Sequence, residues 1–217
     1  MNRRPALIAF AFALIALATA EPAAAHRLDE YLQAARFSIS RDRMDLELDL
    51  TPGISVAPAV FASIDADHDG VVSPAEGADY ARLVFRSIEL SMDSAPVVLK
   101  IVSQRFPELA EMNAGVGMIR LHGTAALPLA SLGRHELFYR NTHEPEISVY
   151  LANALVPTDK QIAINGQRRD SVQQELTIDY RVLDASPWRP AWELMLGSAL
   201  AVALCFTIGR LRVRKAE

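Results

Sequence analysis

The chain has 217 residues, 51% of them hydrophobic, and a formal net charge of −4 at pH 7. This length predicts one domain with a sizeable core plus terminal appendages. Residues 26–190 contain 16 Lys and Arg against 23 Asp and Glu, a net charge of −7. That balance argues against nucleic acid or an anionic lipid surface as the partner of this region.

Residues 1–25 have the three parts of a secretory signal peptide: basic residues, an apolar run and a small-residue cleavage site. Cleavage after Ala25 would make His26 the new N-terminus. Cleavage after Ala20 also satisfies the small-residue rule, and an uncleaved anchor is a third option. We therefore expect an exported domain over residues 26–183. Because the single cysteine is Cys205, that domain would contain no disulfide.

The exported region begins with a predicted β-hairpin formed by residues 33–40 and 44–50. In its second strand, apolar and acidic side chains alternate with a period of two, which is typical of a strand with one buried and one solvated face. The carboxylates are therefore interpreted as a solvated strand face rather than as an acid/base pair; they are Asp45, Glu47 and Asp49.

Residues 65–76 match the calcium loop of an EF-hand. The oxygen ligands that such a loop supplies from positions 1, 3, 5, 7, 9 and 12 fall on Asp65, Asp67, Asp69, Val71 (backbone carbonyl), Ser73 and Glu76. Gly70 occupies position 6, where the chain turns sharply, and the apolar Val72 at position 8 is expected to face the core.

A simpler interpretation of the same stretch is a capping box, Ser73 to Glu76, with Pro74 at the first helical position. Both interpretations predict a helix starting here. The apolar spacing predicts one helix over residues 55–64 and a second after the loop, completing an EF-hand insert at residues 55–90. The predicted buried faces consist of Val56, Val60, Phe61 and Ile64, and then Tyr80, Leu83, Val84 and Ile88. No second acidic loop occurs in the sequence.

The rest of the exported region returns to strand patterns separated by Gly, Pro and Asn turns. The predicted strands are residues 97–106, 117–122, 136–141, 147–155, 162–165 and 175–183. We therefore expect a mainly β (α+β) fold, an antiparallel β-sandwich with the EF-hand inserted after its first hairpin.

The C-terminal part has the pattern of a membrane anchor. Residues 184–190 are the predicted linker, and residues 191–209 contain a single charge and are long enough to cross a bilayer. The tail, residues 210–217, is basic, which places it in the cytoplasm and the main domain on the periplasmic side of the inner membrane. A buried C-terminal helix is the alternative.

Other candidate chemistry is sparse. A mature N-terminus at His26 would present an amine and an imidazole to copper or nickel, but a second histidine would be needed, and His122, His135 and His143 are the available ones. Residues 168–170, Arg-Arg-Asp, are predicted to lie in a turn that could clamp an anion or form an internal ion pair. No nucleophile, zinc-protease or phosphate-loop motif occurs, so we do not expect an enzyme.

Four further segments are considered together: residues 25–34, 48–53, 149–157 and 166–170. They resemble the exported N-terminal region of HupE/UreJ-type hydrogenase/urease accessory membrane proteins. In that family the exported region precedes a multi-helix membrane part whose His and Asp residues are implicated in nickel or cobalt handling. No such part follows in this sequence, so the resemblance implies an accessory, sensing or docking role beside a separate polytopic metal-transport partner.

The sequence thus predicts a membrane-anchored, exported calcium-binding module with a structural or sensing role. One alternative is an accessory nickel, cobalt or copper protein that uses His26. The other is an interaction module whose loop binds no metal.

Overall fold

The computed structural model describes residues 29–128 and 131–184. The predicted signal peptide, His26, the predicted spanning segment 191–209 and the predicted cytoplasmic tail lie outside the described residues. Within the described ranges, no helix combines the length and the apolar content needed to cross a membrane.

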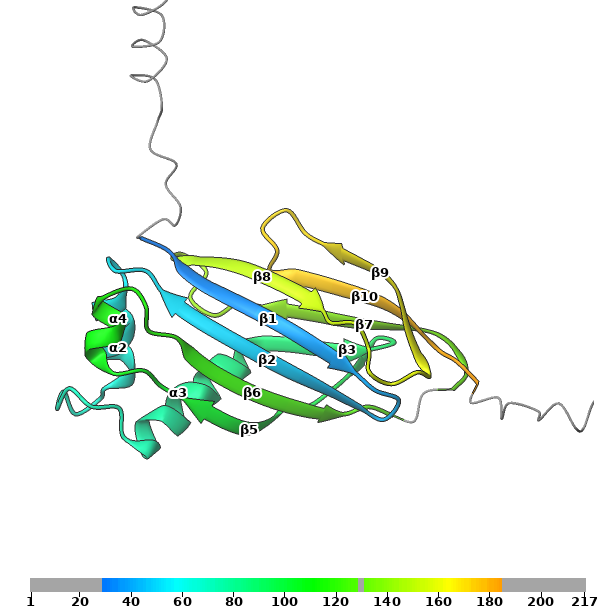
Figure 1. Cartoon of the computed structure of the whole chain (residues 1–217), viewed down its shortest axis with the longest axis horizontal. Coiled ribbons are helices and arrows are strands. Elements are labelled where there is room, and N and C mark those ends of the chain that lie inside the picture. The colour runs from blue at the N-terminus through cyan, green and yellow to red at the C-terminus, as the bar shows by residue number, and fades with distance from the viewer. Residues whose placement is uncertain (1–28, 129–130, 185–217) are drawn as a thin grey trace, which may run out of the picture.

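The described residues are mainly β, with two five-stranded sheets and three short helices (Figure 1). Sheet A has the strand order β5-β6-β2-β1-β8, and sheet B has the order β4-β3-β7-β10-β9. The strands of sheet A are β5 (Lys100–Arg105), β6 (Ile119–Ala126), β2 (Arg43–Pro52), β1 (Tyr31–Ile39) and β8 (Ser148–Ala154). Those of sheet B are β4 (Ala95–Pro96), β3 (Ile88–Met92), β7 (Gly133–Asn141), β10 (Glu175–Val182) and β9 (Ile162–Arg169).

The first hairpin forms as the alternation predicts. Strands β1 and β2 pair antiparallel from Tyr31 opposite Pro52 to Ile39 opposite Met44. The apolar set of β2 is completely buried, because every second side chain of a strand points to the same face; it consists of Met44, Leu46, Leu48 and Leu50.

The expectation of a wholly antiparallel arrangement is wrong at one place. Strand β8 pairs with β1 in parallel, in register from Tyr31 opposite Ser148 to Phe37 opposite Ala154. A parallel pair needs a long crossover connection, and here strands β2 to β7 and the three described helices lie between β1 and β8 in the chain. The local residue pattern of β8 does not show with which strand it pairs or in which direction.

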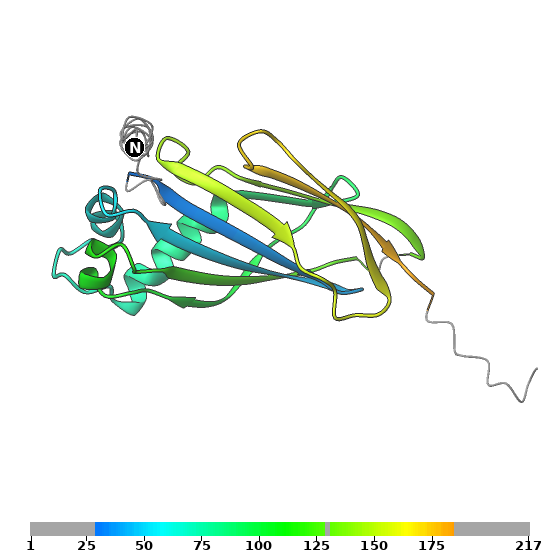
Figure 2. The ribbon, with the colours of Figure 1, turned by 45° about the horizontal axis from the view of Figure 1, so that its top comes forward.

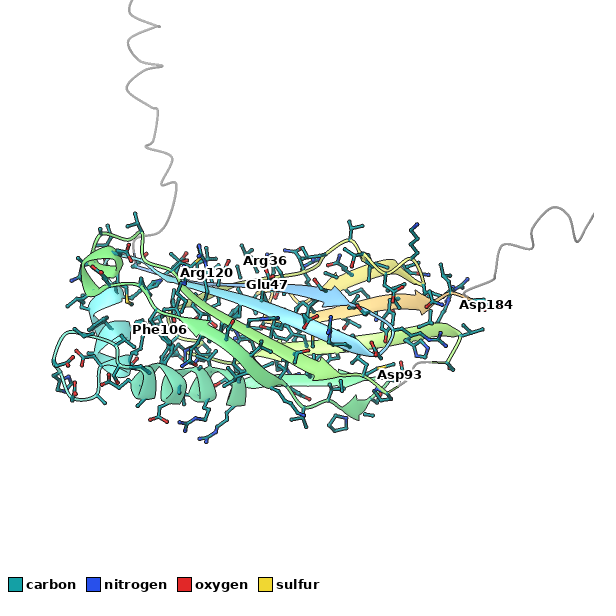
Figure 3. The ribbon with its side chains drawn as sticks, turned by 60° about the horizontal axis from the view of Figure 1, so that its bottom comes forward. Arg36, Glu47, Asp93, Phe106, Arg120 and Asp184 are labelled. Atoms are coloured by element: carbon teal, nitrogen blue, oxygen red, sulfur yellow. The ribbon has the colours of Figure 1, made fainter. Side chains whose placement is uncertain are left out.

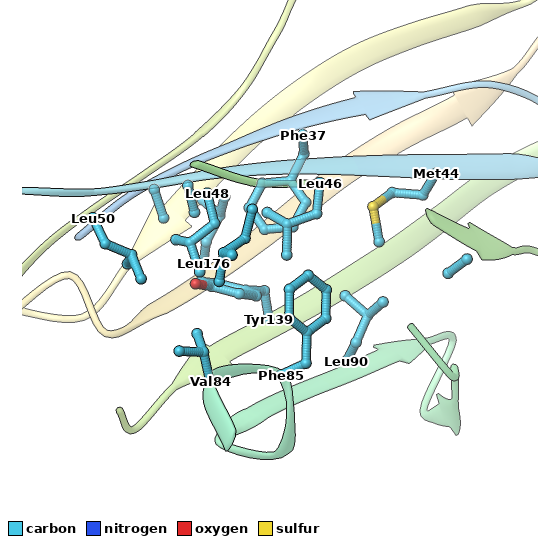
Figure 4. Packing of buried hydrophobic residues seen from close by; sticks show 14 of the residues in the cluster. Phe37, Met44, Leu46, Leu48, Leu50, Val84, Phe85, Leu90, Tyr139 and Leu176 are labelled. Atoms are coloured by element: carbon cyan, nitrogen blue, oxygen red, sulfur yellow. The ribbon is translucent and has the colours of Figure 1, made fainter. Parts of the chain in front are cut away.

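The apolar faces of the two sheets contribute to one buried cluster (Figure 4). Phe37 of β1 packs edge-on against Tyr139 of β7, with 4.8 Å between their ring centroids. Helix α3 (Pro74–Arg86) adds Val84 and Phe85 to the same cluster. The helices are therefore part of the main core rather than a separate unit.

The two predicted helices form as α2 (Ala57–Ile64) and α3, between β2 and β3. In α2, Val60, Phe61 and Ile64 are buried as predicted. In α3 the predicted face is partly wrong: Leu83 is 47% exposed, and Ile88 lies beyond the helix in β3. The buried face is instead rotated toward Ala81 and Phe85, and the ring of Phe85 lies against Gly123 of β6.

Some other elements differ from the predicted ones. Helix α4 (Leu109–Asn113) and the short strands β3 and β4 were not predicted, and β5 is shorter than the predicted strand 97–106. Strand β9 is longer than predicted and includes Arg168 and Arg169. Helices α2 and α4 lie at one end of the sheets, and Asp184, the last described residue, lies at the opposite end (Figures 2 and 3).

Gly123 of β6 gives the ring of Phe85 room to reach sheet A. A Cβ atom at this position would lie 2.3 Å from Phe85 Cε1. We predict that Gly123→Ala lowers the free energy of unfolding by about 1–3 kcal/mol, because a buried ring must shift in a packed core. Chemical denaturation measures this loss, and Phe85→Leu in the same chain should recover part of it.

Gly166→Ala is the matched control, since the nearest atom to its Cβ, Asp179 Oδ2, would lie at an ordinary 3.6 Å. Equal losses at Gly123 and Gly166 would mean that the contact with Phe85 is not the reason.

Candidate metal centre

The loop of residues 65–76 joins two helix ends that are both held in place. Asp65 is the C-cap of α2, is 4% exposed, and its backbone N–H donates to the carbonyl of Phe61. Ser73 is the N-cap of α3 and forms a capping box with Glu76, with Pro74 starting the helix. The capping box and the calcium-loop pattern therefore coexist in one structure.

Two residues of the loop, His68 and Gly70, have left-handed backbone conformations. Gly70 has φ +83°, as expected for position 6, and no atom lies within 4 Å of the place a Cβ would occupy. Its backbone conformation, rather than crowding, is thus what favours glycine. His68 has φ 61° and an exposed side chain.

Three of the predicted ligands converge. One carboxylate oxygen from each of Asp65, Asp67 and Glu76 lies within 4.8 Å of the other two. The carboxylate of Asp65 is oriented by the loop itself: its Oδ2 accepts from the N–H of Gly70 at 2.9 Å and its Oδ1 from that of Asp69 at 3.2 Å.

Glu76 closes the loop onto itself. Its Oε1 accepts a 2.7 Å hydrogen bond from the N–H of Ala66, and its Oε2 accepts a 2.9 Å hydrogen bond from the N–H of Ser73. These bonds, first from Ser73 and then from Ala66 and Asp67, lower the pKa of Glu76 to about 2. Glu76 is therefore ionised at any physiological pH.

Asp67 behaves in the opposite way. A hydrogen bond from the N–H of Asp69 lowers its pKa, but desolvation and the negative charges of Asp69 and Glu76 outweigh that bond, so the pKa is raised. The carboxylates of the loop thus repel one another. A cation among them would remove this repulsion.

The donor set fits calcium. Calcium–oxygen distances are about 2.3–2.6 Å, so two oxygens on one ion lie at most about 5 Å apart, and the three converging oxygens meet this limit.

Two other predicted ligands make hydrogen bonds within the loop instead of joining this group. Asp69 is outside the converging group, and its Oδ1 accepts from the N–H of Val71 at 2.8 Å. Ser73 Oγ accepts from the N–H of Glu76 at 3.3 Å.

Val72, at position 8 of the loop, packs at the margin of the core, as predicted. It lines a shallow apolar pocket together with Phe61, Phe106 and Leu109. The segment that precedes α4 therefore provides Val72 with packing partners within the same chain. We did not predict this segment to be part of the site, because it is too short to show a periodic pattern.

A buried hydrogen-bonded network anchors α3 to both sheets. The hydroxyl of Tyr80 lies 2.8 Å from that of Tyr31 in β1 and 3.0 Å from Nε2 of His143, just after β7. The network continues through Gln33, whose Nε2 donates to the carbonyl of His143 and whose Oε1 accepts from Asn141. Sequence reasoning missed this network, although Gln33 is a polar residue at an inward-facing position of an otherwise apolar strand.

The histidines considered as metal partners of His26 already have other contacts. His143 is 3% exposed and burial lowers its pKa to about 4. Both ring nitrogens of His135 are used, with Nδ1 2.7 Å from Asp93 and Nε2 2.8 Å from the Ser131 carbonyl. Burial lowers the pKa of His135, but these two hydrogen bonds outweigh burial and raise it. His122 Nε2 lies 3.6 Å from Asp45.

The predicted turn at residues 168–170 is wrong. Arg168 and Arg169 belong to β9, where residues of β10, β7 and β8 accept hydrogen bonds from their guanidinium groups. Arg168 pairs with Asp179 and with Glu136, and Arg169 donates to the carbonyl of Ala152. Among the described residues, Arg168 and Arg169 form no ion pair with Asp170, because partners distant in sequence bind both arginines instead.

Comparisons with protein-family models, with curated proteins and with solved structures found no match to this chain. A functional assignment therefore rests on the residues themselves.

The buried His143 predicts acid sensitivity. Its pKa is about 4 in the folded chain and about 6.5 in an unfolded one, so between these values the unfolded state binds the proton more readily. We predict that the free energy of unfolding falls as pH drops from about 6.5 to about 4, with a contribution from this group of order 3 kcal/mol. Above about pH 6.5 the contribution is absent.

The measurement is the pH dependence of unfolding for the natural chain minus that of His143→Gln, which cannot titrate. An NMR titration of the His143 ring in the natural chain is a second readout. A midpoint near 6.5 would contradict the prediction.

Proposed function

We propose that the protein is a calcium-binding module, a β-sandwich with one EF-hand, exported and tethered to the inner membrane by a C-terminal helix. The observation that carries the proposal is the convergence of one carboxylate oxygen each from Asp65, Asp67 and Glu76 between two helix ends. The shared core of the two sheets supports the sandwich description.

The proposed role of calcium is structural. The ligands Asp65 and Glu76 belong to the end of α2 and the first turn of α3, respectively, so an ion held by both would fix the angle between these helices. When bound, the ion supplies positive charge to a cluster of carboxylates that otherwise repel one another. Extracellular modules bind calcium at about 10⁻⁴ to 10⁻³ M, and a single exported hand fits that range.

The loop lies at the end of the described chain opposite Asp184 (Figure 3), and Asp184 begins the predicted linker. A polytopic metal-transport protein is the proposed partner, on the strength of the resemblance to HupE/UreJ-type proteins.

Two alternatives are separated from this proposal by experiment. Mass spectrometry of the mature chain decides whether His26 is the N-terminal residue that copper, nickel or cobalt binding would require. An unchanged melting temperature with calcium and with chelator would favour an interaction module that binds no metal.

Glu76→Gln tests the calcium site. Raising calcium to about 10 mM should raise the melting temperature of the natural chain by about 3–10 °C, since an ion that binds only the folded state stabilises it. The variant loses one charged oxygen ligand, so its affinity should fall at least about tenfold. Calorimetric titration with calcium and with magnesium measures this change.

Glu111→Gln is the matched control. Glu111 occupies the same N3 position in the capping box of α4, where its Oε2 accepts from the N–H of Glu108. It should lose cap stability without losing calcium affinity. No heat with the natural chain, or equal affinity in Glu76→Gln, would contradict the proposal.

The tether is tested by extraction. The full chain should remain with the membrane fraction after an alkaline carbonate wash, whereas a chain ending at residue 184 should be released, because residues 191–209 supply the apolar length needed to span. Release of the full chain would exclude the anchor while leaving the calcium proposal intact.

A further inference from the structure

A groove lies on the outer face of sheet A, far from the carboxylates of the loop in sequence. Strands β1, β2, β6 and β5 form its floor, and its volume is ≈ 760 Å³. Volumes of about 300–1,000 Å³ are typical of small-molecule sites. Figure 3 shows three of its residues, Arg36, Glu47 and Arg120, on neighbouring strands of this face.

Two arginines stand side by side in this groove. Arg105 of β5 is directly opposite Arg120 of β6 in the strand register, and both are exposed. Like charges directly opposite each other on a sheet are unfavourable. Among the residues that the structure describes, neither arginine forms an ion pair.

The nearby carboxylates are already used by a third arginine. Arg36 of β1 holds Glu47 at 3.0 Å and Asp49 at 2.8 Å. Asp49 faces Arg120 across the β2–β6 pair, yet its ion pair is with Arg36. Arg105 and Arg120 therefore remain as a positive pair inside a groove of a region whose net charge is negative.

Neutral and weakly basic donors flank the pair. Ser103 and His122 are directly opposite each other, two residues along the same strands, and line the same groove. The side chains at these positions point to the same face as Arg105 and Arg120, because strand side chains repeat every second residue. Besides Arg36 and the two carboxylates that it holds, the groove is thus lined by two guanidinium groups, a hydroxyl and an imidazole.

A second pair of opposed arginines shows what is particular about the groove. Arg134 and Arg181 are also directly opposite each other, in sheet B. Arg134 lines a pocket that Arg181 does not line. Opposed arginines alone therefore do not form a site, whereas Arg105 and Arg120 share one groove.

The geometry points to an anion site: the groove between β5 and β2 binds a small multivalent oxyanion, a phosphate or a polycarboxylate, through Arg105 and Arg120. Each guanidinium presents parallel N–H donors that match two oxygens of one phosphate or carboxylate. Two adjacent forks select a ligand with two or more negative charges, because such a ligand neutralises both arginines. The site is independent of calcium, since no loop ligand contributes to it.

The test is calorimetric titration of the full chain, solubilised with detergent, using inorganic phosphate and citrate as separate probes. Ionic strength is held constant with sodium chloride, and Glu76→Gln is used as the background so that citrate cannot act by removing calcium. Binding by phosphate alone identifies a phosphoryl ligand, and binding by citrate alone identifies a polycarboxylate. Either result supports the site.

Arg105→Gln and Arg120→Gln should each weaken that binding by about tenfold or more, since each removes charge-assisted hydrogen bonds. Arg120→Lys keeps the charge but loses the parallel N–H donors, so its affinity should fall between that of the Glu76→Gln parent chain and that of Arg120→Gln in the same background. Arg181→Gln removes an arginine that is also exposed and also opposite another arginine but lies outside the groove, and it should leave binding unchanged. Circular dichroism checks that each variant is folded.

No heat with either probe, or equal affinity in Arg105→Gln, Arg120→Gln and Arg181→Gln, would overturn the proposal. An NMR titration of the His122 ring gives an independent readout: its signal should shift on addition of the probe in the natural chain, and an unmoved signal would place the anion elsewhere.

Discussion

The hydrogen bonds of the Tyr80 hydroxyl fix the position of α3 against the sheets. This hydroxyl bonds to Tyr31 in β1 and to His143 after β7, so it connects α3 to a strand of sheet A and to the segment that follows a strand of sheet B. A buried polar group without partners would cost about 1–3 kcal/mol, and the three side chains satisfy one another only when α3 lies where it does. The first turn of α3 carries Glu76, so this network also positions the candidate metal centre.

The candidate centre combines strong local order with electrostatic strain. Backbone N–H groups orient Asp65 and Glu76 before any ion is considered. At Asp67 the hydrogen bond from the N–H of Asp69 is outweighed by desolvation and by the negative charges of Asp69 and Glu76, which raise its pKa. This combination suits a structural calcium site, in which the chain prepares the ligands and the ion offsets their repulsion. Val72 and the segment before α4 complete the surroundings of the loop within one chain.

The outer face of sheet A is electrostatically uneven. On β1 and β2, Arg36 is matched by two carboxylates, whereas on β5 and β6 Arg105 faces Arg120 without such a match. The proposed calcium and oxyanion sites therefore use opposite charges at different places on one fold. Their chemistry can be tested separately.

The sequence by itself determined whatever depends on spacing along the chain. Local spacing predicts the calcium-loop pattern, the capping box of Ser73 and Glu76, and the alternating burial of β2. The structure confirms the capping box and the alternating burial. Only the tertiary structure decided the parallel pairing of β1 with β8, the exposure of Leu83, the partners of Arg168 and the Tyr80 network. Each of these joins or orients residues through contacts distant in sequence, and a local pattern carries no information about which distant partner a side chain will meet.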